Sequence, residues 1–365
     1  MQTTTEIAKS LISPPGDTIQ EHIDLIGMRQ SELAERMGRP REKVNDLIKG
    51  REPISTPTAF QLEKVLGISA GFWLNREKNY RKELYELEQI EKFEKEIDWL
   101  KEFPIKAMQK LGWLPQVNDN KVNIDNLLKF FGVASRNEWE RIFIDEKVSV
   151  AFRISLARTQ SPHAISAWLR QGEIQAQELN LNSFDKKKFK ESLLEIKELA
   201  FHNPFDLPGQ LQSISANCGV SVVFTPNLPN APISGASRWY HNKPLIQLSG
   251  RYKTDDHFWF TFFHEAAHII LHGKKDVFLE DVEGAETDSI KEKQADEFAS
   301  KLLLNDNEWK QVTNSLPYNE NVIFDLAQKL RVPAGIIIGR LQFQKLIRYN
   351  TGNKFKRRIN LFDKN

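Results

Sequence analysis

The stretch that most constrains this chain is residues 262–272, which read FFHEAAHIILH. It sets His264, Glu265 and His268 in the order H-E-x-x-H. On a helix, residues four apart lie on one face, so the two imidazoles could hold one metal ion. Glu265, beside the first histidine, could then act as general base towards a water molecule. The apolar flanks predict a buried helix whose metal face borders a cleft. The alternative is a core helix with two hydrogen-bonded histidines.

A catalytic metal site needs a third protein ligand and an open position. Downstream, residues 292–304 read EKQADEFASKLLL and predict a helix with Glu292 and Asp296 on one face. We expect Glu292 to be the ligand and Asp296 to orient a ligand histidine. A solvated carboxylate at a helix start is the alternative for Glu292. His272, one turn beyond His268, is expected to cap the helix or support a ligand. Two histidines and one carboxylate predict Zn²⁺.

The segments HEAAHIILH and EKQADEFASKLLL, with the lead-in KPLIQLSGRYKTDDHFWFTFFHE, resemble the ImmA/IrrE family of zinc metallo-endopeptidase-like proteins. The resemblance covers roughly residues 210–345. It implies a zinc peptidase that cleaves a repressor or antitoxin in response to stress or DNA damage. The chain departs from the family at Gln294, where a second acid is common, which leaves Glu292 as the ligand that the pattern offers.

The composition is that of an ordinary soluble protein, and 365 residues predict two or three domains. The net charge of +2 means that any nucleic-acid contact must come from a local patch. Cys218 is the only cysteine, so no disulfide can form within the chain. The sequence has no signal-like start and no apolar run of membrane-spanning length. These observations predict a cytoplasmic protein without a membrane partner.

Residues 30–49, QSELAERMGRPREKVNDLIK, predict a helix-turn-helix. A small residue, Ala34, allows two helices to cross closely, and Gly38 allows a sharp turn between them. Between Arg29 and Arg51, seven basic residues face four acidic ones, which gives a local positive charge. The predicted contacts with bases are made by Arg41, Glu42 and Asn45, and those with phosphates by Gln30, Lys43, Lys49 and Arg51.

The following segment, GREPISTPTAFQLEKVLGISAGFWLNREKNY, resembles the HigA-type antitoxins of the XRE family of DNA-binding domains. The resemblance covers about residues 14–82. It implies that the domain binds operator DNA, commonly a palindrome, as a homodimer. The alternative is a small helical bundle that mediates only protein contacts.

Three further regions complete the predicted multidomain organisation. Residues 83–112 carry an amphipathic helix, over 83–103, that serves as a dimer seam or as a connector packed on the next domain. Residues 113–205 form a helical middle domain with no assigned function. Residues 206–350 form an α+β zincin-like domain. The fold class is therefore an all-α N-terminal domain, a helical middle region and an α+β C-terminal domain.

Within the C-terminal domain, the sequence predicts strands over 220–224, 234–240 and 243–248, and helices over 324–330 and 334–346. Arg238 and His241 could stabilise an oxyanion, with structural or surface roles as the alternative. The basic run 354–358 is expected to be a disordered, solubilising tail.

The sequence as a whole predicts a DNA-binding transcriptional regulator with a zinc-dependent endopeptidase domain, acting in a stress or toxin–antitoxin system. Its partners would be operator DNA, a protein substrate (a repressor or antitoxin) and a cognate toxin. The alternative is a non-proteolytic antitoxin and repressor that binds a toxin and keeps a structural metal site.

Overall fold

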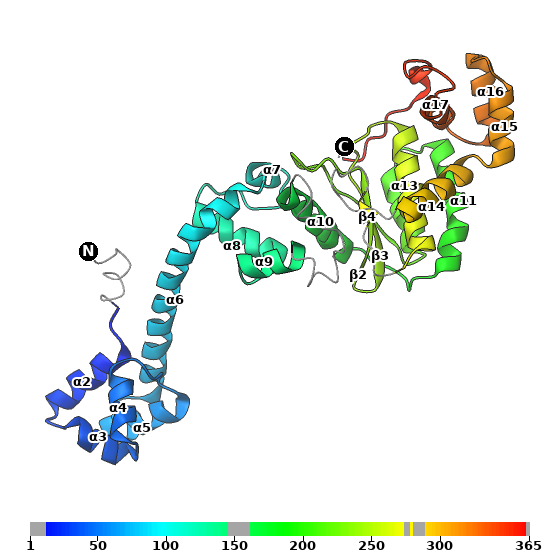
Figure 1. Ribbon diagram of the computed structural model, residues 1–365. Helices are drawn as coiled ribbons and strands as arrows, with labels where there is room; N and C mark the ends of the chain where they lie inside the picture. Colours follow the sequence, from blue (N-terminus) through cyan, green and yellow to red (C-terminus); the bar gives the residue numbers. More distant parts are fainter. Residues whose placement is uncertain (1–11, 145–160, 274–277, 280–288, 363–365) are drawn as a thin grey trace. The chain divides into compact units, whose positions relative to one another are not determined.

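The computed structural model describes residues 12–144, 161–273, 278–279 and 289–362, with the side chains of 88–95 left out of the description. The chain divides into two compact units, Met1–Ile97 and Asp98–Asn365 (Figure 1). The first is helical, and the second combines helices with a small sheet, as the sequence predicts. None of the described helices has the length and apolar character needed to cross a bilayer.

The first unit is a bundle of short helices around one apolar core (Figure 1). The expected helix-turn-helix is α3 (Gln30–Met37) and α4 (Arg41–Ile48), separated by Gly38, whose φ of 64° is left-handed. Ala34 is only 1% exposed, in keeping with a close helix crossing. The turn is closed by the Arg39 amide, which donates to the Ala34 carbonyl. Its helices are α2 (Pro15–Leu25), α3 (Gln30–Met37), α4 (Arg41–Ile48), α5 (Thr56–Leu66) and α6 (Ala70–Lys101).

Helix α6 is longer than the sequence pattern suggested. It begins at Ala70, so the amphipathic segment 83–103 continues a helix that starts in the helix-turn-helix domain. Trp73, in its first turn, is fully buried and donates from its indole nitrogen to the Ile68 carbonyl. The helix ends at Lys101, and Pro104 precedes the next helix. A role of this segment in dimerisation stays a prediction.

The second unit contains the remaining elements. Helices cover both faces of its sheet and extend beyond it (Figure 1). The elements are α7 (Ile105–Lys110), α8 (Asn120–Phe131), α9 (Arg136–Phe143), α10 (Pro162–Gln177), α11 (Lys186–His202), α12 (Leu207–Ala216), β1 (Ser221–Phe224), β2 (Gly235–Tyr240), β3 (Lys243–Leu248), α13 (Asp255–Leu271), β4 (Phe278–Leu279), α14 (Ser289–Leu303), α15 (Asp306–Asn314), α16 (Glu320–Leu330), α17 (Ala334–Phe343) and the 3₁₀ turn η2 (Asn353–Phe355).

The sheet has the order β1-β3-β2-β4. The pair β1 and β3 is parallel, and β2 is antiparallel to both of its neighbours. The three strands expected from the sequence are confirmed. The two-residue strand β4 was not anticipated; it pairs with Ala236 and Ser237 of β2. It lies at the edge of the described sheet, next to the metal-site helix.

Helix α10 covers one face of the sheet, and α13 covers the other (Figure 1). A buried polar network joins α10 to the strands. Arg238 of β2 donates to the Gln247 side chain at 3.0 Å and to the Leu169 carbonyl of α10 at 2.6 Å. Gln247 of β3 donates to the Trp168 carbonyl at 2.7 Å. Arg238 is 2% exposed, and these contacts favour the structural alternative; a role towards an oxyanion stays a prediction. The other oxyanion candidate, His241, is an exposed residue of the β2–β3 turn.

The main core of the second unit lies around α13 and includes α11 from the predicted middle domain. Phe189, Leu193 and Ile196 of α11 are fully buried in the same cluster as Phe262 and Phe263 of α13. Apolar burial of this extent is the dominant stabilising term in a fold. The boundary expected at residue 206 stays a prediction, but the packing of α11 ties residues on both sides of it to one core.

The C-terminal residues 353–359, here called the strap, are folded, so the expectation of a disordered tail over 354–358 is wrong. The Asp255 amide donates to the Arg357 carbonyl at 2.9 Å, and the Ile359 amide donates to the Lys253 carbonyl at 2.9 Å. Lys356 lies 2.6 Å from the carboxylate of Asp256. The basic run therefore has buried acidic partners, which a charge count along the sequence does not reveal.

Candidate metal centre

Helix α13 places the H-E-x-x-H residues inside the protein. Trp259, Phe262 and Phe263 are fully buried on its apolar side. His264 and His268 are 4% and 2% exposed and face α14. The sequence favours this arrangement because apolar residues surround the two histidines, and four-residue spacing keeps both rings on one face.

Helix α14 brings Glu292 to the two histidines. The Nε2 atoms of His264 and His268 lie 2.9 Å apart. The Glu292 Oε2 atom lies 3.1 Å from the His264 Nε2 atom and 3.6 Å from that of His268. Each residue offers one ligand atom, and these atoms all lie within 4.8 Å of one another. The structure thus brings together the three residues that the sequence analysis predicts to be metal ligands.

The three atoms fit a tetrahedral metal ion. Ligands about 2.0–2.1 Å from zinc at tetrahedral angles lie about 3.3 Å apart. The distances of 2.9, 3.1 and 3.6 Å fall on either side of that value. Two imidazoles and one carboxylate are a donor set of catalytic zinc, with one position left for water or substrate. The triad could therefore hold a metal ion.

Each histidine has a partner on its other ring nitrogen. The His264 Nδ1 atom lies 2.9 Å from the Asp296 Oδ1 atom. A proton on Nδ1 would be donated to that carboxylate, which leaves the Nε2 lone pair for a metal. The His268 Nδ1 atom lies 2.9 Å from the His272 Nδ1 atom, and the His272 Nε2 atom lies 3.1 Å from the Gln294 side-chain oxygen. The supporting roles expected for Asp296 and His272 are thus geometrically available. The contact of Gln294 was not foreseen.

The surroundings set the charge of the triad. Burial lowers the pKa of His268 to about 4, although the nearby Glu292 carboxylate opposes this shift. Burial alone would raise the pKa of Glu292, but hydrogen bonds from His264 and His268 outweigh it and lower the pKa to about 2. A neutral imidazole and an ionised carboxylate are the protonation states that bind metal.

Glu265 is fully buried and lies on the side of α13 that faces β2. Gly235, the first residue of β2, is packed against it. A Cβ atom at residue 235 would lie 2.9 Å from the Glu265 Oε1 atom and 2.6 Å from the Thr261 methyl group. The absence of a side chain at Gly235 therefore leaves room for the carboxylate. Sequence reasoning missed this glycine, although its place at the start of a predicted strand is a signal of close approach.

Phe278 of β4 was also missed. Its ring stacks on that of His268, with ring centroids 3.6 Å apart and an angle of 18° between the planes. The two-residue strand thus covers the second histidine and limits the access of water to it. No periodic pattern in the sequence marks Phe278, because its segment is short and isolated.

The residues nominated for DNA contact lie on the first unit. Arg41, Glu42 and Lys49 are exposed on or at the end of α4, and Asn45 is half-buried there. Some of the predicted phosphate contacts already have partners in the unit. Arg51 is paired with Asp46 at 2.9 Å, Lys43 with Glu52 at 3.0 Å, and Gln30 donates to Gln20 at 2.5 Å. Nothing in the structure assigns them to DNA.

The comparisons with known proteins agree with both units. Residues 218–342 match the family model of the IrrE N-terminal-like domain, Peptidase M78. The solved structure of an addiction module antidote protein of the HigA family from Coxiella burnetii shares 30% sequence identity with this chain. The match covers 22% of this chain and 90% of that one, with a TM-score of 0.21. A search of curated proteins finds no match.

These matches confirm the resemblances expected from the sequence. The second unit carries a metallopeptidase-like domain of the Peptidase M78 family. The match over residues 218–342 agrees with the ImmA/IrrE resemblance expected for this part of the chain.

Proposed function

We propose that this protein is a DNA-binding transcriptional regulator whose C-terminal domain is a zinc-dependent endopeptidase. The single observation that carries the proposal is the buried Glu265 beside the convergent donors of His264, His268 and Glu292. A site that served only to hold a metal would not require a buried acid at this position. The peptidase-family match over residues 218–342 supports the same reading.

When bound, zinc would supply the positive charge that polarises a peptide carbonyl. The protein's own residues have separate tasks. Glu265 would take a proton from the attacking water and pass it to the leaving amine. Asp296 would hold the ring of His264 in one tautomer and one orientation. Phe278 and the apolar side of α13 would keep bulk water from the histidines.

The substrate class follows from the fusion. We propose that the peptidase cleaves a regulatory protein, a repressor or an antitoxin, in a stress response or a toxin–antitoxin system. The HigA-like unit would bind a palindromic operator as a homodimer through α4. Its net positive segment and the exposed Arg41 and Lys49 support this part of the proposal.

The test is Glu265→Gln, which removes the proton acceptor and keeps the size of the side chain. We expect the variant to retain its metal and its fold but to lose cleavage. Metal content, thermal unfolding and the pattern of proteins cleaved in cells would be measured beside Glu297→Gln. Glu297 is an exposed residue of α14 that is paired with Lys301. Cleavage by Glu265→Gln at the wild-type rate would refute the proposed role.

A second candidate is a non-proteolytic antitoxin that represses its operator, binds a toxin and keeps the metal for structure. The observation in its favour is the likeness to a protein described as an addiction module antidote. An experiment in cells distinguishes the two candidate functions. If Glu265→Gln represses normally and fails to respond to the inducing stress, proteolysis is the switch. If it responds like wild type, the toxin-binding regulator is the better account.

A further inference from the structure

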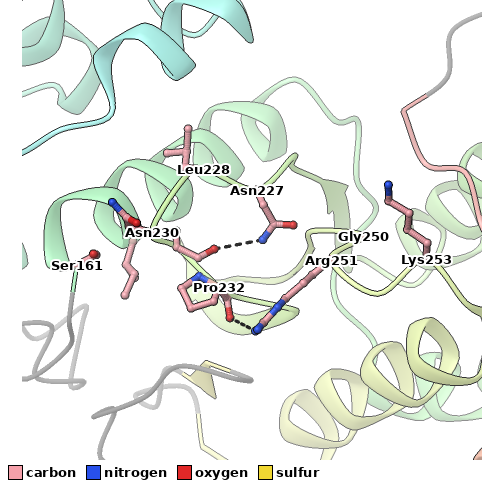
Figure 2. A pocket seen from close by; sticks show the side chains of 10 residues that line it. Ser161, Asn227, Leu228, Asn230, Pro232, Gly250, Arg251 and Lys253 are labelled. Atoms are coloured by element: carbon pink, nitrogen blue, oxygen red, sulfur yellow. Dashed lines mark hydrogen bonds between the residues drawn. The ribbon is translucent and has the colours of Figure 1, made fainter.

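The second unit contains a large cavity away from the residues of the metal triad. Its volume is about 730 Å³, and it lies between the start of α10, the loop 227–232 and the segment after β3 (Figure 2). Cavities of this size are typical of sites for small organic molecules. None of the residues proposed above to bind metal or DNA lines it.

The cavity wall is preformed. The Asn227 amide group donates to the Ala231 carbonyl at 3.2 Å (Figure 2). It also donates to the Ile233 carbonyl at 2.9 Å, which closes the loop on itself. Arg251 crosses from the opposite segment and donates to the Pro232 carbonyl (Figure 2). Its guanidinium also lies 5.2 Å from the centre of the Tyr252 ring. A ligand would therefore enter a cavity whose wall is already held by hydrogen bonds, so binding would cost the protein little conformational entropy.

Two cationic side chains belong to the described wall. Arg251 and Lys253 both line the cavity, and none of the described lining residues is acidic. Within the part of the chain that the structure describes, no ion pair involves Lys253. Its backbone is held in place, because the Lys253 carbonyl accepts a hydrogen bond from Ile359 of the strap. A lysine at a cavity wall, without an acidic partner among the described residues, favours an anionic ligand.

Helix α10 adds a second source of positive potential. Ser161 and Ile165, at its start, line the cavity. The helix is 16 residues long, has no acidic residue in its first turn and has no side-chain cap among the described residues. The start of such a helix carries partial positive charge from its free N–H groups. The neighbouring Leu228, Ala231 and Pro232 make the rest of the wall apolar.

We propose that this cavity binds a small organic anion, a molecule with a carboxylate or phosphate group and an apolar part. Lys253, with Arg251 and the start of α10, would hold the anionic group, and Leu228, Ala231 and Ile165 would contact the apolar part. The site does not depend on the peptidase activity. It is linked to the metal helix through the chain, because Lys253 stands two residues before Asp255, the first residue of α13.

The experiment titrates the full-length, zinc-loaded protein with benzoate, phenyl phosphate and the neutral benzamide, followed by calorimetry at low salt. We expect saturable binding of at least one of the two anions and much weaker binding of benzamide. The anion that binds more tightly shows whether the site prefers a carboxylate or a phosphate group. Lys253→Gln should weaken anion binding at least about tenfold, since it removes a charge-assisted contact.

Lys243→Gln is the matched control. Lys243 is an exposed lysine at the other end of β3, so its loss changes the net charge equally and leaves the cavity intact. Ser161→Phe tests the same idea by volume, because the ring would occupy part of the cavity without changing the charge. Zinc content and thermal unfolding of all variants check the fold. Equal affinity in Lys253→Gln and Lys243→Gln would overturn the proposal, and so would the absence of saturable binding by both anions.

Discussion

The two units of this chain place their functional residues in opposite environments. In the first unit, Arg41 and Lys49 are exposed, and the core of Leu33, Ala34 and Leu47 lies beneath them. In the second, His264 and Glu265 are themselves buried in the helix that forms the core. A surface residue can change without loss of packing, whereas a buried polar group stabilises the fold only while its partners are present. The difference teaches that changes to the proposed DNA contacts should leave the first unit folded, whereas changes to the metal triad should also affect the folding of the second unit.

The largest effect is expected from His264→Ala, which should abolish both metal binding and cleavage. The change removes a ligand, deprives Asp296 of its partner and leaves a cavity beside Glu292. We expect loss of one zinc per chain by elemental analysis and a lower melting temperature. His257→Ala, on the first turns of the same helix and stacked on Tyr252, is the matched control. If His264→Ala kept its metal, the ligand assignment would be wrong, and an unchanged melting temperature would disprove the coupling of the metal site to folding.

The supporting carboxylate Asp296 should matter less than the ligands. Its contact with the His264 Nδ1 atom, at 2.9 Å, fixes the ring but does not reach the metal position. Asp296→Ala should therefore lower metal affinity about 10- to 100-fold. The measurement is competition with a zinc chelator, and Glu297→Gln serves as control. A loss as complete as that of His264→Ala would show that Asp296 is itself a ligand.

The buried carboxyl of Asp255 should make the stability of the second unit depend on pH. Burial raises its pKa from 3.8 to about 6, although the hydrogen bond and charge of Arg357 oppose this shift. Because the folded protein holds this proton more tightly than the unfolded chain, the contribution to stability is complete below pH 4. It is lost as the pH rises through 6, and its size is about 3 kcal/mol.

The measurement compares melting temperatures of wild type and Asp255→Asn between pH 4 and 7. We expect the wild type to lose stability relative to the variant over this range. Asp125→Asn, at an exposed pair with Lys129, should show no such trend. Parallel curves for wild type and Asp255→Asn would contradict the prediction.

The smallest effects should come from the first unit, and they should leave its folding unchanged. Arg41→Ala should weaken specific operator binding by about 1–3 kcal/mol if its side chain reads a base edge. Lys49→Ala should weaken binding to all sequences and reduce the slope of the salt dependence by about one. Binding would be measured on the full chain at several salt concentrations. A fall in melting temperature with either change would show that these surface residues also contribute to folding, and the two units would then not differ in this respect.

Local patterns were sufficient for much of this structure. The spacing of His264 and His268, the strand over residues 243–248 and the turn at Gly38 each depend on neighbours within a few residues. The sequence could not predict the contact of Gly235 with Glu265 or of Arg238 with α10, since these join elements far apart in the chain. The strap was misjudged for the same reason. Lys356 and Arg357 of the strap have buried acidic partners about 100 residues earlier in the chain.

The strap also sets an order of events during synthesis. Asp255 and Arg357, which share a hydrogen bond, are separated by 102 positions. At about 5–20 residues per second, a ribosome needs roughly 5–20 s to cover that distance. During this interval the start of the metal-site helix has emerged without the cations that its two buried carboxylates require. The helix-turn-helix unit could already be folded by then, whereas the ion pairs at the start of the metal-site helix can form only when the strap leaves the ribosome.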